Sequence, residues 1–313
     1  MKRCLPWLLT LAVAGGCTRN LGSVLRGDGA PEQRIVGLYA CDDPTGHAPV
    51  TLDATRPLTV IVHGCTSSGN RFKTLAGVFQ AHGQQTLCFN YNDRDYLNTS
   101  ATQLAAALSA LQTRLAPQEL TVLGHSQGGL VARRALQVDL PKPLVVKEGF
   151  SFRLVTVSSP FAGIKSSADC GRTWLHVLSL TATVMVCLVI TGNKWTEIPP
   201  GSGFMTNLSP TLATRHLHIV TDERDSCRRL RPDGSCADDD FVFGLEEQNA
   251  PQINGRPGVT TVEVRQGHAA VVGENGVVPQ RLIDLLQEQG VLAQTPAARR
   301  DAIAMFIDRL YAR

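Results

Sequence analysis

The chain contains 313 residues, of which 43% are hydrophobic, 18% charged and 5% aromatic. A chain of this length and composition can bury the core of one large globular domain. The formal net charge of +3 is mild, so the charge balance gives no reason to expect nucleic acid as a partner. The sequence has no internal repeat or low-complexity tract, which excludes repeat architectures.

The first residues have the pattern of an export signal. Lys2 and Arg3 precede an apolar run that is too short to span a membrane as a stable helix. The run ends in Val13-Ala14-Gly15-Gly16-Cys17, which resembles a bacterial lipoprotein box, and Cys17 would then carry the lipid. An ordinary signal peptide with an incidental cysteine is the alternative.

The expected domain organisation follows from this pattern. We expect residues 1–17 to be a signal peptide, residues 18–33 a polar tether and residues 34–313 one folded domain. Thr18 rather than an aspartate follows Cys17, which by analogy with enteric bacteria favours the outer membrane. The predicted location is therefore the cell envelope, facing the periplasm or the surface, with a membrane as the partner of the lipidated Cys17.

Apolar strand patterns alternate with helix patterns along the rest of the chain. Strands are predicted at 35–40, 58–62, 85–91, 119–123, 152–157, 216–221 and 260–265, and helices at 70–82, 99–116, 127–138, 278–290 and 297–312. Strands that alternate with helices form a mostly parallel twisted sheet with helices on both faces. The predicted fold class is therefore α/β, and its ligand sites are expected at the carboxyl ends of the strands.

The first strong strand pattern, at 58–62, is followed by His63-Gly64-Cys65. Glycine allows a backbone to approach a neighbouring group closely. Backbone N–H groups in such a loop can hold the negative oxygen of a tetrahedral intermediate. We predict that the N–H of Cys65 is one such donor, and that His63 orders the loop.

The segment Gly124-His125-Ser126-Gln127-Gly128 lies between a strand pattern and a helix pattern. A tight strand-to-helix turn strains the serine backbone and offers its hydroxyl to a base. Glycines two positions either side leave room for that bend. Ser126 is therefore the predicted nucleophile, and the N–H of Gln127 is the predicted second oxyanion donor. A chance match to G-x-S-x-G is the alternative, which the strand before and the helix after disfavour.

The stretch from about 160 to 213 interrupts the alternation of strands and helices. Its middle, 174–190, is uncharged and has the length and hydrophobicity of a membrane span. A span there would place Ser126 and the later histidine on opposite sides of a bilayer. We therefore predict a cap or lid over the active site, whose opening would expose apolar surface and favour a lipid substrate.

Nine cysteines suit the oxidising compartment that export implies. Without Cys4 and Cys17 an odd number remains, so one thiol should stay free. Cys227 and Cys236 flank a turn and form the predicted disulfide. Two further pairings are open: one among Cys41, Cys65 and Cys88, and one between Cys170 and Cys187.

His268 follows the strand pattern at 260–265 in a Gly-His loop. A histidine after a strand end suits a general base, which must accept and return a proton near neutral pH. His216 and His218 alternate on one strand pattern and could suggest a metal site, but no third ligand is evident. We therefore predict His268 as the base, with no metal and no cofactor.

The acidic partner of the base is less clear from the residues alone. Asp222 lies at a strand end, where the acid of a hydrolase can sit. Asp239 and Asp240 precede a short apolar pair, in a segment that the Cys227–Cys236 loop could anchor. Because a run of aspartates is commonly a solvated loop, all three remain candidates at this point.

These motifs together resemble the α/β-hydrolase superfamily, from Ile35 to the end of the chain. The features that carry the resemblance are the order serine, aspartate, histidine, the His-Gly after an early strand, and Gly-His-Ser-Gln-Gly-Gly at the turn. Within the superfamily, the sequence is similar to bacterial lipases and the GPI inositol-deacylase-like group. Those lipases commonly carry the acid in an Asp-x-hydrophobic-Val segment, to which Asp240-Phe241-Val242-Phe243 is similar. The resemblance therefore favours Asp240 as the acid, with Asp222 as the alternative, and implies an α/β-hydrolase fold with an inserted cap.

The predicted function is a serine ester hydrolase of lipase type that acts on lipid-like acyl esters through an acyl-enzyme. An acyltransferase or a thioesterase would use the same residues with another acceptor or leaving group. A non-catalytic hydrolase-fold protein that binds lipid or a protein at the cell envelope is the alternative from another class. An integral membrane protein anchored by 174–190 is a further alternative. The sequence does not indicate an oligomeric state.

Overall fold

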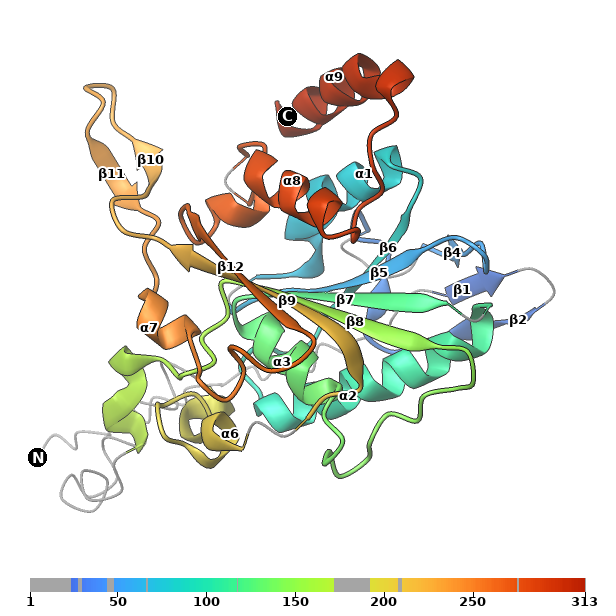
Figure 1. The fold of residues 1–313 in the computed structure, drawn as a ribbon, viewed down its shortest axis with the longest axis horizontal. Helices are drawn as coiled ribbons and strands as arrows, with labels where there is room; N and C mark the ends of the chain where they lie inside the picture. The colour runs from blue at the N-terminus through green and yellow to red at the C-terminus, as the bar shows by residue number, and fades with distance from the viewer. Residues whose placement is uncertain are drawn as a thin grey trace, which may run out of the picture.

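The computed structural model describes residues 24–27, 30–43, 48–65, 67–116, 118–171, 192–207, 210–274 and 276–312. Within these residues, the centre of the molecule is a seven-stranded sheet in the order β12-β9-β8-β7-β5-β6-β3, in which only the edge strand β3 runs antiparallel to its neighbour (Figure 1). The strands are β3 (Leu38–Tyr39), β5 (Leu58–Val62), β6 (Gln85–Phe89), β7 (Glu119–His125), β8 (Ser151–Val157), β9 (Ala213–Asp222) and β12 (Val259–Arg265).

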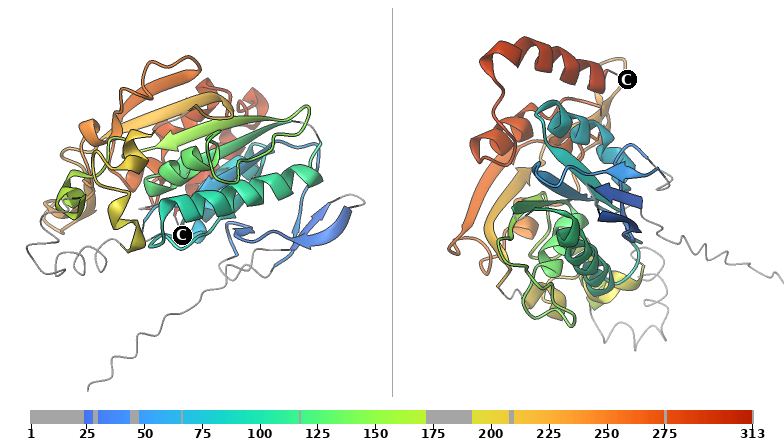
Figure 2. Two further views of the ribbon diagram at one scale, coloured as in Figure 1. Left: turned by 90° about the horizontal axis from the view of Figure 1, so that it is seen from below. Right: turned by 90° about the vertical axis from the view of Figure 1, so that its right-hand side faces the viewer.

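Helices cover both faces of the sheet (Figures 1 and 2). One face carries α2 (Leu97–Leu111) and α3 (Gln127–Ala135), and the other carries α1 (Lys73–Ala81), α8 (Gln280–Glu288) and α9 (Arg300–Tyr311). Short 3-10 turns are η1 (Gly69–Phe72), η2 (Gln112–Arg114), η5 (Ala270–Val272) and η6 (Ala297–Arg299). The predicted α/β architecture, a mostly parallel twisted sheet with helices on both faces, is confirmed.

The periodicity of the sequence explains this layering. All five residues of β5 are buried, as expected for a strand covered on both faces. On α2, the buried side chains recur every three or four residues and turn one stripe of the helix to the sheet. They are Leu97, Ser100, Ala101, Leu104, Ala105, Ala107, Leu108 and Leu111.

A small second sheet forms from the amino-terminal end of the described chain. It has the order β2-β1-β4, with β1 (Val24–Gly27), β2 (Ala30–Arg34) and β4 (Val50–Thr51). Leu25 on β1 is fully buried in the same core cluster as α2. Part of the segment expected to be a tether, 18–33, therefore belongs to the folded domain. The predicted signal peptide and Cys17 lie outside the described residues.

The described parts of the expected cap lie at the carboxyl ends of the central strands (Figure 2). They include η3 (Lys165–Gly171), η4 (Asn193–Thr196) and α6 (Gly203–Thr206). The segment 174–190 falls in the range 172–191, outside the described residues. None of the helices in the described ranges is long and apolar enough to cross a membrane.

A hairpin of β10 (Cys227–Leu230) and β11 (Cys236–Asp239) extends beyond the body of the domain (Figure 1). The predicted Cys227–Cys236 disulfide closes it and is confirmed. A second disulfide joins Cys41 to Cys88. Cys65 is the free thiol among the described residues, and the possible bridge to Cys187 lies outside them. A short helix, α7 (Leu245–Gln248), follows the hairpin.

Leu25→Ala should test whether β1 is part of the core. Removing this fully buried side chain is expected to lower the free energy of unfolding by about 2–5 kcal/mol. The measurement is urea denaturation, with Val36→Ala as the matched control because Val36 is 61% exposed. Equal midpoints for the two variants would contradict the placement of β1 in the core.

Candidate active site

Five loops meet at the carboxyl edge of the sheet. The register pairs Val62 with Gly124 and His125 with Val157, so β5, β7 and β8 end side by side. It also pairs Asp222 with Arg265, so β9 and β12 end together. The loops after these strands therefore bring together residues that are far apart in the sequence.

Ser126 forms the sharp turn between β7 and α3. Its φ of 55° and ψ of −127° lie in a region that residues with a side chain rarely adopt. Its backbone N–H donates to the carbonyl of Val157 at 2.9 Å. A Cβ on Gly124 would lie 2.5 Å from the carbonyl oxygen of Gly128, and a Cβ on Gly128 would lie 2.2 Å from that of Val62. The bend therefore requires glycine at both positions, as the sequence pattern predicts.

The loop after β5 lies directly against Ser126. A Cβ on Gly64 would lie 3.0 Å from the Ser126 Cβ, so glycine permits this close approach. A cavity of about 300 Å³ opens here, and Cys65, Ser126 and His268 all line it. Its other lining residues are Gly64, Ser67, Arg71, His125, Arg228, Val242, Ala269 and Glu274. The two predicted oxyanion donors thus adjoin Ser126, since Gln127 follows it and Cys65 shares its cavity.

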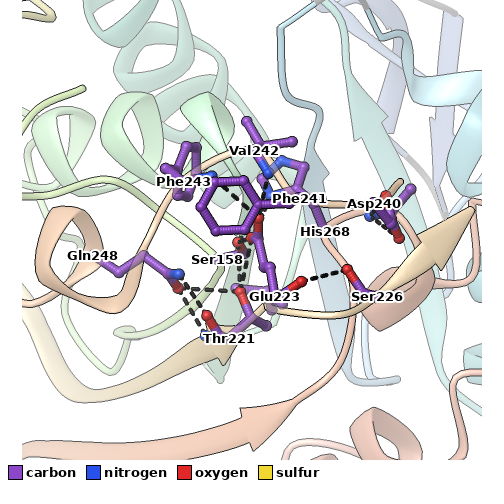
Figure 3. A network of polar contacts seen from close by, with 12 residues as sticks. Ser158, Thr221, Glu223, Ser226, Asp240, Phe241, Val242, Phe243, Gln248 and His268 are labelled. Atoms are coloured by element: carbon purple, nitrogen blue, oxygen red, sulfur yellow. Dashed lines mark hydrogen bonds and ion pairs between the residues drawn. The ribbon is translucent and has the colours of Figure 1, made fainter. Parts of the chain in front are cut away.

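The ring of His268 is held by Glu223 (Figure 3). Nδ1 of His268 lies 2.8 Å from Oε1 of Glu223, and the Glu223 side chain is fully buried. The other carboxylate oxygen, Oε2, accepts the backbone N–H groups of Val242 at 2.7 Å and Phe243 at 3.2 Å. Phe243 also packs edge-on against the imidazole, with ring centroids 4.9 Å apart. Glu223 therefore fixes the orientation of the ring from the side opposite Nε2.

The carboxylate of Glu223 is ionised in this setting. Burial by itself would raise its pKa, but the hydrogen bonds from His268, Ser158 and Val242 together hold the pKa below its ordinary value. An ionised carboxylate accepts hydrogen bonds only, so Nδ1 of His268 carries the proton. The neutral imidazole then has a bare Nε2, which is the form a general base needs.

The expectation that the carboxylate of Asp240 or Asp222 contacts the imidazole ring of His268 is not met. The carboxylate of Asp240, fully buried, pairs with Arg228 at 2.9 Å and accepts the backbone N–H groups of Ala269 and Ala270. Asp222, which is 8% exposed, accepts two hydrogen bonds from the exposed guanidinium of Arg224, and this pair lowers the pKa of Asp222 to about 2. These partners turn both carboxylates away from the imidazole ring, which is why neither carboxylate contacts it.

Asp240 instead anchors the loop that carries His268. Its backbone carbonyl accepts the N–H of His268 at 2.9 Å. A Cβ on Gly267 would lie 2.3 Å from Oδ2 of Asp240, so the loop wraps closely around the carboxylate. From the other side, Nε2 of His125 contacts the carbonyl of His268 at 2.9 Å. The residue before Ser126 thus helps to place the loop that carries His268.

Ser158 is a second serine with positive φ, 46°, at the end of β8. Its Oγ donates to Oε1 of Glu223 at 2.6 Å, accepts from Thr221 Oγ1 at 2.7 Å and lies 2.9 Å from Nδ1 of His268 (Figure 3). It is fully buried and lies on the carboxylate side of the imidazole. Its hydroxyl therefore supports the Glu223–His268 pair, whereas Ser126 faces the cavity.

His216 and His218 are buried strand residues. Both contact Oγ1 of Thr156, at 2.8 and 3.0 Å, and burial lowers the pKa of His218 to about 4. In the described part of the chain, no group of three or more histidine, cysteine, aspartate or glutamate side chains has an arrangement that could hold a metal ion.

Glu223 is the site residue that sequence reasoning missed. It follows Asp222 directly at the end of β9, and neighbouring side chains at a strand end point in opposite directions. Asp222 pairs with the exposed side chain of Arg224, while Glu223 between them is directed inward and is 1% exposed. Two features could have identified Glu223 from the sequence. Side chains alternate in direction along Asp222-Glu223-Arg224, and hydrolase triads use glutamate as well as aspartate.

Part of the chain matches the model of a known protein family. Residues 58–198 match a family model described as palmitoyl protein thioesterase. This range includes Cys65, Ser126 and Gln127 and ends before Glu223 and His268. No curated protein matches this chain significantly.

Several solved structures are similar to this chain at low sequence identity. The propeptide form of the Bacillus licheniformis lipase BlEst2 is similar with a TM-score of 0.51 and 15% identity, over 78% of this chain and 52% of that chain. Its mature form has a TM-score of 0.48 and 17% identity, over 78% and 96%. A lipase/esterase from Lactobacillus plantarum has a TM-score of 0.45 and 17% identity, over 85% and 96%. The sheet order of this chain and its likeness to the propeptide form, whose TM-score exceeds 0.5, agree with the α/β-hydrolase fold that the sequence predicts.

Ser126→Gly should stabilise the protein, because glycine adopts the observed backbone conformation without strain. We expect the free energy of unfolding to rise by about 1 kcal/mol, after the greater chain entropy of glycine is offset. The measurement is urea denaturation. Ser126→Ala is the matched control, since alanine loses the hydroxyl but keeps the strain. A gain no larger than that of the alanine variant would contradict a strained turn.

Proposed function

We propose that this protein is a serine hydrolase that cleaves lipid-like acyl esters through Ser126, His268 and Glu223. The hydroxyl of Ser126 attacks the acyl carbonyl while Nε2 of His268 takes its proton. Glu223 stabilises the imidazolium that forms, because its carboxylate already accepts the proton on Nδ1. His268 then gives its proton to the leaving group, and water releases the acid from the acyl-enzyme by the same steps.

The oxyanion of each tetrahedral intermediate would be held by the backbone N–H groups of Cys65 and Gln127. Gln127 opens α3, whose first N–H groups point toward developing negative charge. Cys65 lies in the loop that packs against Ser126 through Gly64. Two donors fixed before the reaction lower the barrier without a cost for reorganisation.

One observation carries this proposal. Ser126 has a strained backbone at a strand-to-helix turn and shares a cavity with a histidine whose other ring nitrogen is bound by a buried carboxylate. A purely structural serine would gain nothing from that strain. A non-catalytic binding protein would have no need for the ionised, fully buried Glu223.

A thioester is the second candidate substrate. The match of residues 58–198 to a palmitoyl protein thioesterase model favours it specifically. The chemistry is the same up to the acyl-enzyme, since only the leaving group changes from an alcohol to a thiol. The resemblance of the sequence to bacterial lipases and the inositol-deacylase-like group favours an oxygen ester with a lipid-like acyl chain.

A matched pair of substrates should test the proposed activity. An oxygen ester and a thioester with the same acyl chain are compared by kcat/KM over a series of chain lengths, with and without detergent. We expect the ester to react faster, and a faster thioester would favour the second candidate. Ser126→Ala should lower both rates by about 10⁴-fold or more. Hydrolysis that survives in this variant would contradict the proposal for either substrate.

Glu223→Gln should test whether Glu223, rather than Asp240, is the carboxylate that orients the ring of His268. We expect kcat to fall by about 10³–10⁴-fold, because glutamine no longer holds the tautomer or stabilises the imidazolium. Asp240→Asn is the matched control. It should lower kcat less than about tenfold but reduce the melting temperature, since Asp240 is buried and paired with Arg228. The reverse order of kcat losses would restore Asp240 as the acid.

We further propose that the mature protein is a lipoprotein of the cell envelope, anchored through Cys17. Two or more acyl chains bind a membrane stably, so the wild type should incorporate a palmitate analogue and fractionate with membranes. Cys17→Ser should abolish both results. An unlabelled wild type that stays soluble would mean that Cys17 is an incidental residue of an ordinary signal peptide.

A further inference from the structure

Lys194 is a buried cation beside both proposed oxyanion donors. It lies on η4 in the cap and is only 2% exposed. Its Nζ donates to Sγ of Cys65 at 3.2 Å and to Oε1 of Gln127. The third partner of the ammonium group is the backbone carbonyl of Asp93. A single side chain of the cap therefore touches both residues whose N–H groups would hold the oxyanion.

The turn that carries Lys194 packs against the loop before α2 and against the first turn of α2. The N–H of Asn193 donates to the carbonyl of Arg94 at 2.6 Å, and the carboxylate of Glu197 accepts from Nδ2 of Asn98 at 2.6 Å. A Cβ on Gly192 would lie 2.3 Å from the carbonyl oxygen of Arg94, so the two backbones are in close contact. These contacts on both sides of Lys194 fix where its ammonium group lies.

A lysine at this buried position loses hydration free energy. Burying an ammonium group is expensive even when all three of its protons have acceptors. A neutral donor could satisfy the same acceptors with a smaller loss of hydration energy. A positive charge can, however, stabilise negative charge that forms nearby during a reaction. This electrostatic interaction is strong because a water-poor environment screens it little.

We propose that Lys194 is a positioning residue of the oxyanion hole, through which the cap takes part in the reaction. Its ammonium group holds the side chains of Cys65 and Gln127 and so fixes the loops that present their N–H groups. Its charge favours the oxyanion over the neutral carbonyl of the substrate. This inference rests on the proposed acyl hydrolysis at Ser126.

The test compares Lys194→Met, Lys194→Gln and Lys194→Arg with the wild type. We expect kcat to fall by roughly 10–100-fold in the methionine and glutamine variants, with KM within about threefold, because the interaction grows only as the oxyanion forms. Arginine keeps the charge and should recover part of the loss. Lys165→Met is the matched control, since Lys165 lies on η3 of the same cap with its side chain 62% exposed.

Binding of two inhibitors distinguishes positioning from a merely structural role. A boronic acid forms a tetrahedral, negatively charged adduct on the serine, whereas the amide analogue of the substrate stays neutral. In Lys194→Gln and Lys194→Met, the boronic acid should lose affinity by about the same factor as kcat/KM, while the affinity for the amide stays unchanged. Equal losses for both inhibitors, or a kcat equal to that of Lys165→Met, would overturn the proposal.

Different experimental results would contradict this inference and the proposed function. If the wild type shows no hydrolysis that depends on Ser126, the proposed function fails. If hydrolysis depends on Ser126 but not on Lys194, only the present inference fails. Thermal melting of each variant establishes that it is folded, and Lys194→Gln, which retains a hydrogen-bond donor, decides the matter if Lys194→Met does not fold.

Discussion

The structure of the site depends on one strained residue. Holding Ser126 in its observed conformation costs about 1–3 kcal/mol, which the central strand β7 and the packed helix α3 must supply. The same turn places the hydroxyl at the cavity, the N–H of Gln127 beside it, and the ring of His125 against the loop of His268. A small change in this turn would therefore disturb the nucleophile, the oxyanion hole and the base together.

Three carboxylates near the end of β9 have different tasks, which their surroundings set. Asp222 pairs with the exposed guanidinium of Arg224, Asp240 is buried against Arg228 and backbone N–H groups, and Glu223 is buried against the imidazole. The side chains do not differ in intrinsic acidity enough to explain this division. The direction in which each points, and the donors that it meets there, decide which one orients the ring.

The parts of this structure that were predicted from the sequence rest on local patterns. The turn at Ser126 needs glycines at fixed offsets, and the buried strands need continuous apolar runs, so both can be predicted from the sequence. The contact between Glu223 and His268 joins residues 45 positions apart, and no local pattern separates Glu223 from the nearby aspartates. The strands in 24–34 were missed because β1 has only four residues and the edge strand β2 is mostly polar, so neither has a strong period. Lys194 was missed because its partners Cys65, Asp93 and Gln127 come from three distant segments of the chain.

The central claim is that Ser126 is the nucleophile and that Glu223 activates it through His268. It is tested most directly by reacting the protein with a fluorophosphonate and mapping the adduct by mass spectrometry. The account predicts one adduct per chain, on Ser126, formed far more slowly in Glu223→Gln and at a nearly normal rate in Asp240→Asn. An adduct on Ser158, or a rate on Ser126 that does not depend on Glu223, would contradict it.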